Sequence, residues 1–159
     1  MILNVQKYDL LISHSQIQVR SRDFGEAFCQ WGKVNIKQGA IIHDDYVVFD
    51  PLPDDAFGAQ VHVVFSNEFM IDTNSQRCIV VPFKINKKGS LVISSATEKF
   101  NVNIDYSPGI YDLYYEICEG DEIYYRFTFI SSLSLKDAVY IMDDPWGGVK
   151  NSRLEFGVL

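Results

Sequence analysis

The sequence predicts an all-β protein, an antiparallel β-sandwich of about nine strands with one short helix near the N-terminus. Short segments of alternating apolar and polar residues recur along most of the chain, and clusters of Gly, Pro, Asn and Asp separate them. One segment alone has apolar residues at helical spacing. The 159 residues, 47% hydrophobic and 22% charged, contain no repeat and no linker, so we expect a single β-sandwich domain over residues 1–159.

The first predicted strand, residues 8–19, changes phase along its length. Leu10 and Ile12 share one face, whereas Ile17 and Val19 share the other, and four polar residues separate the two pairs. A strand whose alternation shifts in this way needs a bulge or a bend, or it passes from one sheet to another. We therefore expect an irregularity between the two pairs.

Residues 23–39 contain the helical candidate. Asp23 and Glu26 have the spacing of a capping box, with Asp23 as the N-cap, and Gly39 predicts the end of the helix. The apolar residues at helical spacing are Phe24, Ala27, Phe28, Trp31 and Val34. Two internal glycines weaken a helix, so we expect it to cover only part of the segment.

Eight further strands are predicted downstream, at residues 46–49, 60–66, 78–85, 90–95, 100–104, 110–118, 122–131 and 138–142. Residues 153–158 are an additional candidate. Residues 86–89 predict a turn that would pair the strands on either side of it as a hairpin, and residues 119–121 predict a second hairpin. Pro82 lies inside a predicted strand and favours an edge position or a bulge there.

Aromatic residues make up 14% of the chain, and many of them lie in the second predicted hairpin. Alternation places Tyr125, Phe127 and Phe129 on one face and Tyr124 on the other. Core packing is the favoured interpretation, and a tyrosine surface that recognises a protein or a sugar is the alternative. Trp146 lies in a loop and is either a binding tip or an anchor for the C-terminal tail.

The net charge of −7 comes from 21 acidic and 14 basic residues, and the acids are clustered. Residues 38–76 contain seven acids and no Lys or Arg, residues 100–125 contain six acids and no Lys or Arg, and residues 143–144 form a third cluster. Such a surface repels phosphate backbones and attracts basic proteins, so we expect a basic protein partner and no direct nucleic-acid binding. Keeping the protein soluble is the alternative role of these charges.

The sequence contains no motif that predicts catalysis. The G-x-S-x-G, G-x-x-x-x-G-K-[ST] and G-x-G-x-x-G motifs do not occur, and the absence of C-x-x-C disfavours zinc. Calcium is the better metal hypothesis, although the aspartates of residues 44–55 do not have the spacing of a calcium-binding loop. Three cysteines lie in apolar or aromatic stretches, which favours buried thiols. We therefore expect a protein that is not an enzyme and has no cofactor.

Location can also be predicted from the sequence. The longest apolar stretch, residues 79–83, is far shorter than the roughly 20 residues that cross a bilayer, so we expect no membrane span. Residues 1–19 lack the apolar region and the cleavage site of a signal peptide, so we expect a cytoplasmic protein. The oligomeric state stays open.

Several segments, in their order along the chain, resemble a known family: residues 10–19, Trp31, Gly39, residues 47–49, 79–83, 89–93 and 108–113, and the late strand ending at Asp143. They resemble the competence protein J (ComJ/Nin) family, the inhibitors of a bacterial DNA-entry nuclease. The similarity covers a core of about residues 8–144, and the chain departs from the family in the C-terminal extension 145–159 and the loop around residues 50–58. The resemblance implies a small cytoplasmic bacterial protein that blocks a DNA-degrading nuclease, in competence regulation or toxin immunity, and it supplies no catalytic residues.

An acidic inhibitor can occupy the basic cleft of a nuclease by presenting carboxylates where phosphates would lie. We expect the acidic loops and Trp146 to form this contact surface, and which cluster faces the nuclease stays open. The candidate residues are Asp44, Asp45, Asp50, Asp54, Asp55, Glu119, Asp121, Glu122, Asp143, Asp144 and Trp146. A calcium- or carbohydrate-binding β-sandwich module is the alternative function.

Overall fold

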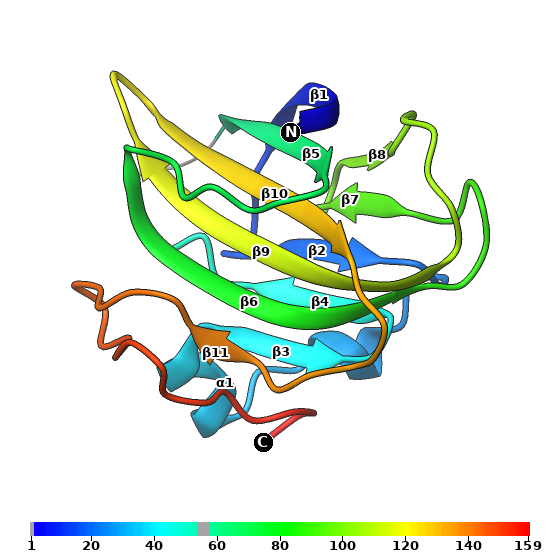
Figure 1. Cartoon of the computed structure of the whole chain (residues 1–159). Coiled ribbons are helices and arrows are strands. Elements are labelled where there is room, and N and C mark those ends of the chain that lie inside the picture. Colours follow the sequence, from blue (N-terminus) through cyan, green and yellow to red (C-terminus); the bar gives the residue numbers. More distant parts are fainter. Residues whose placement is uncertain (1, 54–57) are drawn as a thin grey trace.

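The computed structural model describes residues 2–53 and 58–159 and contains two β-sheets that face each other (Figure 1). The first sheet contains, in order across it, β1 (Ile2–Leu11), β5 (Gly58–Ser66), β10 (Ile123–Ser131), β9 (Gly109–Glu119), β6 (Ser75–Ile85) and β11 (Val139–Tyr140). The second sheet contains β3 (Ala40–His43), β4 (Tyr46–Phe49), β2 (Ile17–Arg20), β7 (Val92–Ser94) and β8 (Lys99–Asn101). The all-β prediction with one short helix is confirmed. Among the described strand pairs β5 and β10 are parallel, and the others are antiparallel.

The core lies between the two sheets and is rich in aromatic rings. Phe49 of the second sheet stacks on Tyr115 of the first sheet, with 4.1 Å between the ring centroids. Each buried side chain of this size contributes about 1.5–3 kcal/mol to folding. The predicted core residues of the second hairpin are all buried, namely Tyr125, Phe127 and Phe129. Core packing is therefore the role of this aromatic face.

The phase change within residues 8–19 marks the passage of the chain from one sheet to the other. β1 ends at Leu11 in the first sheet, and β2 begins at Ile17 in the second sheet. His14 and Ser15 have φ angles of 55° and 50° and turn the chain between the two strands. Because the sheets face each other, the apolar residues of both strands enter the same core.

The predicted helix is split, and the capping box at Asp23 does not form. Its place is taken by a 3-10 turn, Glu26–Cys29, and the α-helix α1, Lys33–Gln38, follows Gly32. Gly39 ends α1 with a φ of 85°, as expected. Two of the aromatic residues at helical spacing, Phe28 and Trp31, cover the outer face of the second sheet, where Phe28 stacks on Tyr46 at 5.1 Å. No helix of the described residues is long and apolar enough to cross a membrane.

The first predicted hairpin is wrong, and the second is confirmed. Residues 86–89 form a turn, but β7 pairs with β2 and β8 and has no pairing with β6. The turn carries the chain to the opposite sheet because both strands bury one face in the shared core. β9 and β10 pair through nine residue pairs, from Ile123–Glu119 to Ser131–Tyr111.

Three differences in the strands have simple physical causes. β3 was not predicted, because Ala40–His43 is a short, almost entirely apolar segment without alternation. Residues 153–158 form no strand and make a single bridge, between Arg153 and Val139. β11 pairs with β6 only at Ile79 and Val80, so Pro82 lies on a stretch of β6 where no described strand covers that edge.

The C-terminal tail ends beside α1 and is held there by two buried amide side chains of the helix. Asn35 accepts the N–H of Leu159 at 2.8 Å and donates to the carbonyl of Gly157 at 2.9 Å. Gln38 donates to the carbonyl of Glu155 at 3.0 Å and accepts its N–H at 2.8 Å. Both amides also bond outside the tail, since each donates to the carbonyl of Ala40 and Asn35 accepts the N–H of Gly32. The tail therefore completes the hydrogen bonding of these two buried side chains.

Replacing Gly32 with alanine should displace this tail. An added Cβ would lie 2.0 Å from the carbonyl oxygen of Leu159, which accepts two N–H groups of α1. We expect Gly32→Ala to lower the free energy of unfolding by about 1–3 kcal/mol and to speed hydrogen exchange at the amides of Gly157 and Leu159. Gly58→Ala, whose added Cβ meets no atom of the described residues within 4 Å, is the control. Equal exchange rates in the two variants would contradict the docking of the C-terminal tail against α1.

Candidate functional site

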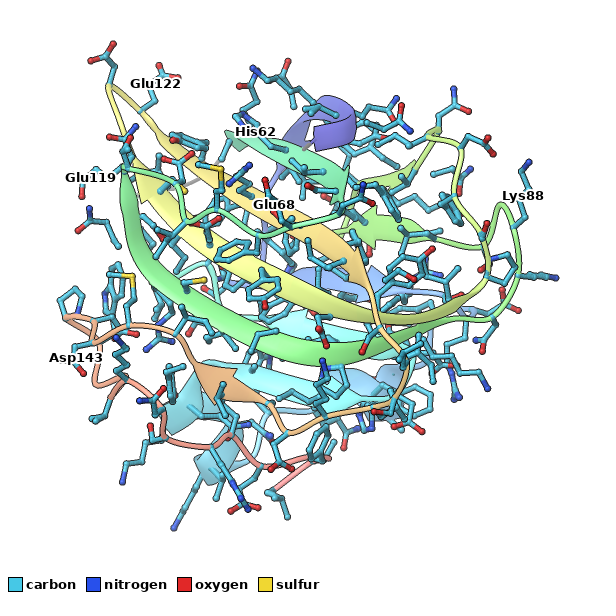
Figure 2. The ribbon with its side chains drawn as sticks, in the orientation of Figure 1. His62, Glu68, Lys88, Glu119, Glu122 and Asp143 are labelled. Atoms are coloured by element: carbon cyan, nitrogen blue, oxygen red, sulfur yellow. The ribbon has the colours of Figure 1, made fainter. Side chains whose placement is uncertain are left out.

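The turn between β9 and β10 carries three exposed carboxylates, those of Glu119, Asp121 and Glu122. The turn is closed by the pairing of Glu119 with Ile123 and by a 3.1 Å hydrogen bond from the N–H of Gly120 to the carbonyl of Glu122. Figure 2 shows Glu119 and Glu122 projecting from this end of the hairpin. None of the three forms an ion pair with a basic side chain of the described residues. They therefore present unpaired negative charge to the solvent.

Two grooves flank this turn, which forms the ridge between them. The first, of about 730 Å³, lies between the turn and the strands β1 and β5. The second, of about 550 Å³, is lined by the turn together with Pro53, Gln76 and Trp146. No Lys, Arg or His of the described residues lines either groove. We call the carboxylates of the turn and of the first groove the acidic end: Asp9, Glu98, Glu119, Asp121 and Glu122.

Asp9 and Glu98 reach the acidic end from distant parts of the sequence, and the sequence analysis did not select them. Asp9 pairs with Gln60 on β5, which pairs in turn with Tyr124 next to the turn. Glu98 lies near Asp9 because one of its carboxylate oxygens accepts the N–H of Leu11 at 3.1 Å. No local pattern distinguishes either residue from an ordinary solvated acid, so only the sheet pairing identifies them.

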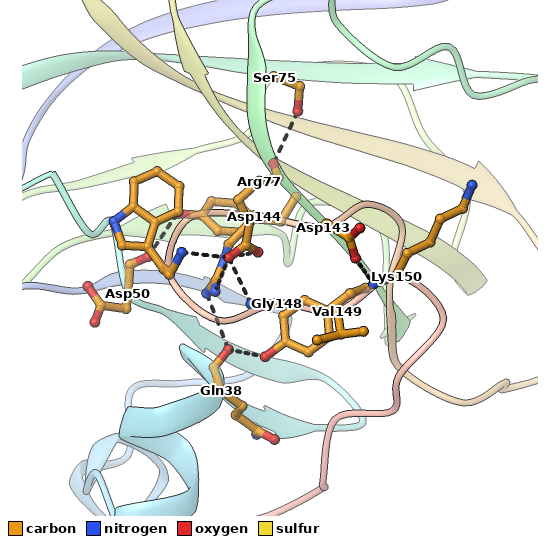
Figure 3. Close-up of polar contacts among 12 residues, drawn as sticks. Gln38, Asp50, Ser75, Arg77, Asp143, Asp144, Gly148, Val149 and Lys150 are labelled. Carbon is orange, nitrogen blue, oxygen red and sulfur yellow. Dashed lines mark hydrogen bonds and ion pairs between the residues drawn. The ribbon is translucent and has the colours of Figure 1, made fainter.

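Asp143 and Asp144 are adjacent in sequence, but their carboxylates have different surroundings (Figure 3). Asp143 is exposed, and its carboxylate accepts the N–H of Lys150 at 2.8 Å. Figure 2 places Asp143 on the same side of the molecule as Glu119. The side chain of Asp144 is 0% exposed. Of this pair, Asp143 alone can present its carboxylate to a partner.

Asp144 has a structural role, and its predicted contact with a partner is not supported. It forms a bidentate ion pair with Arg77, with distances of 2.7 Å to Nε and 3.0 Å to Nη2. It also accepts the N–H groups of Trp146 and Gly148 at 2.9 Å each. Burial opposes the ionisation of Asp144, but the hydrogen bonds from Arg77 and Gly148 hold its pKa below the ordinary value. Asp144 therefore fastens the C-terminal segment to β6.

Trp146 anchors the tail, and its role as a binding tip stays a prediction. Its ring packs on the core and lies 5.7 Å from the guanidinium carbon of Arg77. The residue also lines the second groove beside Glu119. It therefore anchors the tail and remains within reach of a partner that enters the groove.

Asp44 and Asp45 lie at the other end of the molecule, in the turn between β3 and β4. The N–H of Lys84 donates to the carbonyl of Asp44 at 2.7 Å, and Lys84 pairs with Ile110 at the start of β9. Glu119 is the last residue of the same strand, which has 11 residues and therefore a length of about 30 Å. The two acidic clusters thus belong to separate surfaces.

Two candidate carboxylates have partners within the chain. Asp45 is buried, forms an ion pair with Arg22 at 2.7 Å and accepts a hydrogen bond from Asn86 at 2.7 Å. Asp50 is half-buried, and its carboxylate accepts the N–H of Leu52 at 2.9 Å. These bonds give both residues a role in the local structure. Two further candidates lie outside the described residues, namely Asp54 and Asp55.

The other ionisable groups favour a structural role. Burial is the main cause that raises the pKa of both Cys78 and Cys118, so their thiols stay protonated. Glu116 is buried on the outer face of the first sheet, where burial raises its pKa and Arg126 lies 3.3 Å away. The described residues bring no three His, Cys, Asp or Glu side chains together in a way that could hold a metal ion.

These features define a two-sheet β protein whose main candidate site is a solvent-exposed acidic surface. The model of the family Competence protein J (ComJ) matches residues 9–130. The chain therefore belongs to the ComJ family, and the resemblance seen in the sequence is confirmed.

One solved structure is similar over most of this chain. It is the crystal structure of ComJ, inhibitor of the DNA degrading activity of NucA, from Bacillus subtilis. The two chains share 20% sequence identity and a TM-score of 0.69, over 83% of this chain and 99% of that one. At this identity the likeness shows a common fold. No curated protein sequence matches the chain. The family match stops at residue 130, so the tail lies outside it.

Proposed function

We propose that the protein inhibits a DNA-degrading nuclease by binding it through the acidic end. Membership of the ComJ family carries this proposal, because the ComJ of similar fold is an inhibitor of the DNA-degrading activity of NucA. The proposed setting is the bacterial cytoplasm, in competence regulation or in immunity to a toxin nuclease. The tail, which the family match does not include, would adjust the choice of target through Asp143 and Trp146.

The shape and charge of the acidic end support the proposed mechanism. A nuclease attracts DNA with basic groups in its cleft, and these groups also attract a surface of unpaired carboxylates. The ridge carries Glu119, Asp121 and Glu122, and the first groove adds Asp9 and Glu98. A ridge between two grooves can enter a cleft while the grooves receive the basic side chains at its rim. Bound in this way, the inhibitor would exclude DNA because its carboxylates would occupy the positions in the nuclease cleft where DNA phosphates bind.

The calcium- or carbohydrate-binding alternative has less support. The described residues contain no cluster of three metal-binding side chains. Asp45 and Asp50, which would be calcium ligands in that model, have partners within the chain. The family match also favours a protein partner.

An inhibition assay tests the proposal directly. The tagged protein captures partners from a lysate of its own bacterium at low salt, and rising salt releases them. We expect one nuclease to be released, and the purified nuclease to stop degrading fluorescently labelled DNA when the protein is added in a one-to-one ratio. If the released nucleases keep full activity at saturating inhibitor, the proposal is wrong. The same assay with heat-unfolded protein controls for non-specific effects of its negative charge.

A further inference from the structure

A cavity of about 320 Å³ lies on the second sheet, on the face that points away from the first sheet. Val19 and Ile93 point into the core, so alternation turns their neighbours Arg20 and Ser94 to the outer face. The strands that supply these residues, β2 and β7, lie side by side in Figure 1. The cavity is lined by polar and aromatic side chains, among them Arg20, Phe24, Ser94, Thr97, Glu98 and Lys99.

Arg20 is a buried cation that has no counter-charge among the described residues. It is 8% exposed, and no carboxylate of the described residues lies within ion-pair distance of it. Its Nη1 donates to the carbonyl of Arg22 at 2.8 Å, whereas its Nε has no hydrogen-bond partner. A buried charge is normally paired, and a buried donor is normally bonded, because the unpaired state is costly. Arg20 therefore lacks an anionic partner among the residues that the structure describes.

The rest of the lining suits an anion with several oxygens. Lys99 adds a second cation, and Ser94 and Thr97 add hydroxyl donors. Glu98 also lines the cavity, but one oxygen of its carboxylate accepts the N–H of Leu11 on β1. Two cations and two hydroxyls match the multiple oxygens and the charge of a phosphate monoester better than a carboxylate.

Phe24 gives the cavity an aromatic wall. Its side chain is 61% exposed, and it stacks on no ring of the described residues. A free aromatic face beside a phosphate-binding group favours a ligand that joins a phosphate to a planar ring. We propose that this cavity binds a nucleoside monophosphate, with the phosphate at Arg20 and Lys99 and the base stacked on Phe24. This proposal does not rest on the proposed nuclease inhibition, although Glu98 lines both this cavity and the first groove of the acidic end.

Titration calorimetry on the full chain tests the site with three probes: AMP, inorganic phosphate and adenosine. We expect AMP to bind about tenfold more tightly than inorganic phosphate, since stacking adds to the phosphate contacts. Adenosine, which lacks the phosphate, should bind at least about tenfold more weakly than AMP.

Single substitutions separate the two halves of the site. Phe24→Ala, at an exposed position, should weaken AMP about tenfold and leave inorganic phosphate unchanged. Lys99→Ala and Arg20→Met should weaken both phosphate-bearing probes about tenfold or more. Lys87→Ala removes an exposed lysine that does not line the cavity and is the matched control. Because Lys99 is exposed, its variant keeps the test valid even if Arg20→Met fails to fold.

Three results would overturn the proposal. The first is no binding of AMP or inorganic phosphate to the wild-type chain at millimolar concentration. The second is equal binding of adenosine and AMP, which would remove the role of the phosphate. The third is unchanged AMP binding in Lys99→Ala and Phe24→Ala, which would place the ligand elsewhere.

Discussion

Asp144→Asn should lower the free energy of unfolding by about 3–5 kcal/mol, the largest loss that we expect from a single polar substitution in this protein. The change leaves the guanidinium of Arg77, 2% exposed, buried without its counter-charge. Urea unfolding followed by circular dichroism measures the loss. Asp137→Asn is the matched control, because Asp137 and Arg153 form an exposed pair at 3.4 Å. The control should change stability by less than about 1 kcal/mol, and an equally small effect for Asp144→Asn would show that the buried pair is not needed.

The same carboxylate makes stability depend on pH. Folding holds the pKa of Asp144 below its ordinary value of 3.8, so the ionised carboxylate stabilises the fold above the pKa of the unfolded state. This contribution disappears as the pH falls through the lower pKa of the folded state. The stability difference between wild type and Asp144→Asn should therefore shrink as the pH falls from about 5 to below the ordinary value of 3.8. A stability difference that stays constant over this pH range would contradict the assignment of the pH dependence to Asp144.

Removing the charge of the turn should have the largest effect on binding. We expect Glu119→Gln, Asp121→Asn and Glu122→Gln, combined in one variant, to slow association with the nuclease about tenfold or more at low salt. The three carboxylates are exposed and have no ion pair with the described basic residues, so the fold should be unchanged. Stopped-flow measurement at low and high salt gives the rates, and the difference from wild type should decrease as salt rises.

The control for this variant removes three carboxylates away from the acidic end. The two variants therefore have the same net charge. The control combines Asp44→Asn, Asp105→Asn and Asp137→Asn, which change exposed residues outside both grooves of the acidic end. We expect this control to associate at close to the wild-type rate. If both triple variants slow association equally, net charge would explain the effect, and the acidic end would not be the contact surface.

The sequence predicts the parts of this fold that are determined by residues close together along the chain. The second hairpin was predicted because its two strands alternate strongly and meet at residues 119–121. Residues 86–89 show the limit: their turn signal is local, whereas the sheet that receives β7 is decided by packing across the core. The capping box at Asp23 did not form for a related reason. Gly25 and Gly32 weaken a continuous helix, and the split helix lets Phe28 and Trp31 pack on the outer face of the second sheet.

The candidate site was predictable only where its residues form a run. Glu119, Asp121 and Glu122 occupy one turn, so their grouping follows from the sequence. Asp9 and Glu98 join them through strand pairing and a single side-chain hydrogen bond, which no local pattern encodes. Asp144 shows the converse, because a run of acids does not reveal which carboxylate is paired inside the protein.

The parallel pairing of β5 with β10 has a consequence for how the chain reaches its native state. Gln60 pairs with Tyr124, which follows it by about 60 residues, so the centre of the first sheet closes only after a long loop has been ordered. During synthesis β5 leaves the ribosome well before β10 and can pair with β1 alone. Its other edge then stays open, with free backbone donors and acceptors, until β10 arrives. We therefore expect slow folding and a nascent chain that is prone to aggregate during this interval.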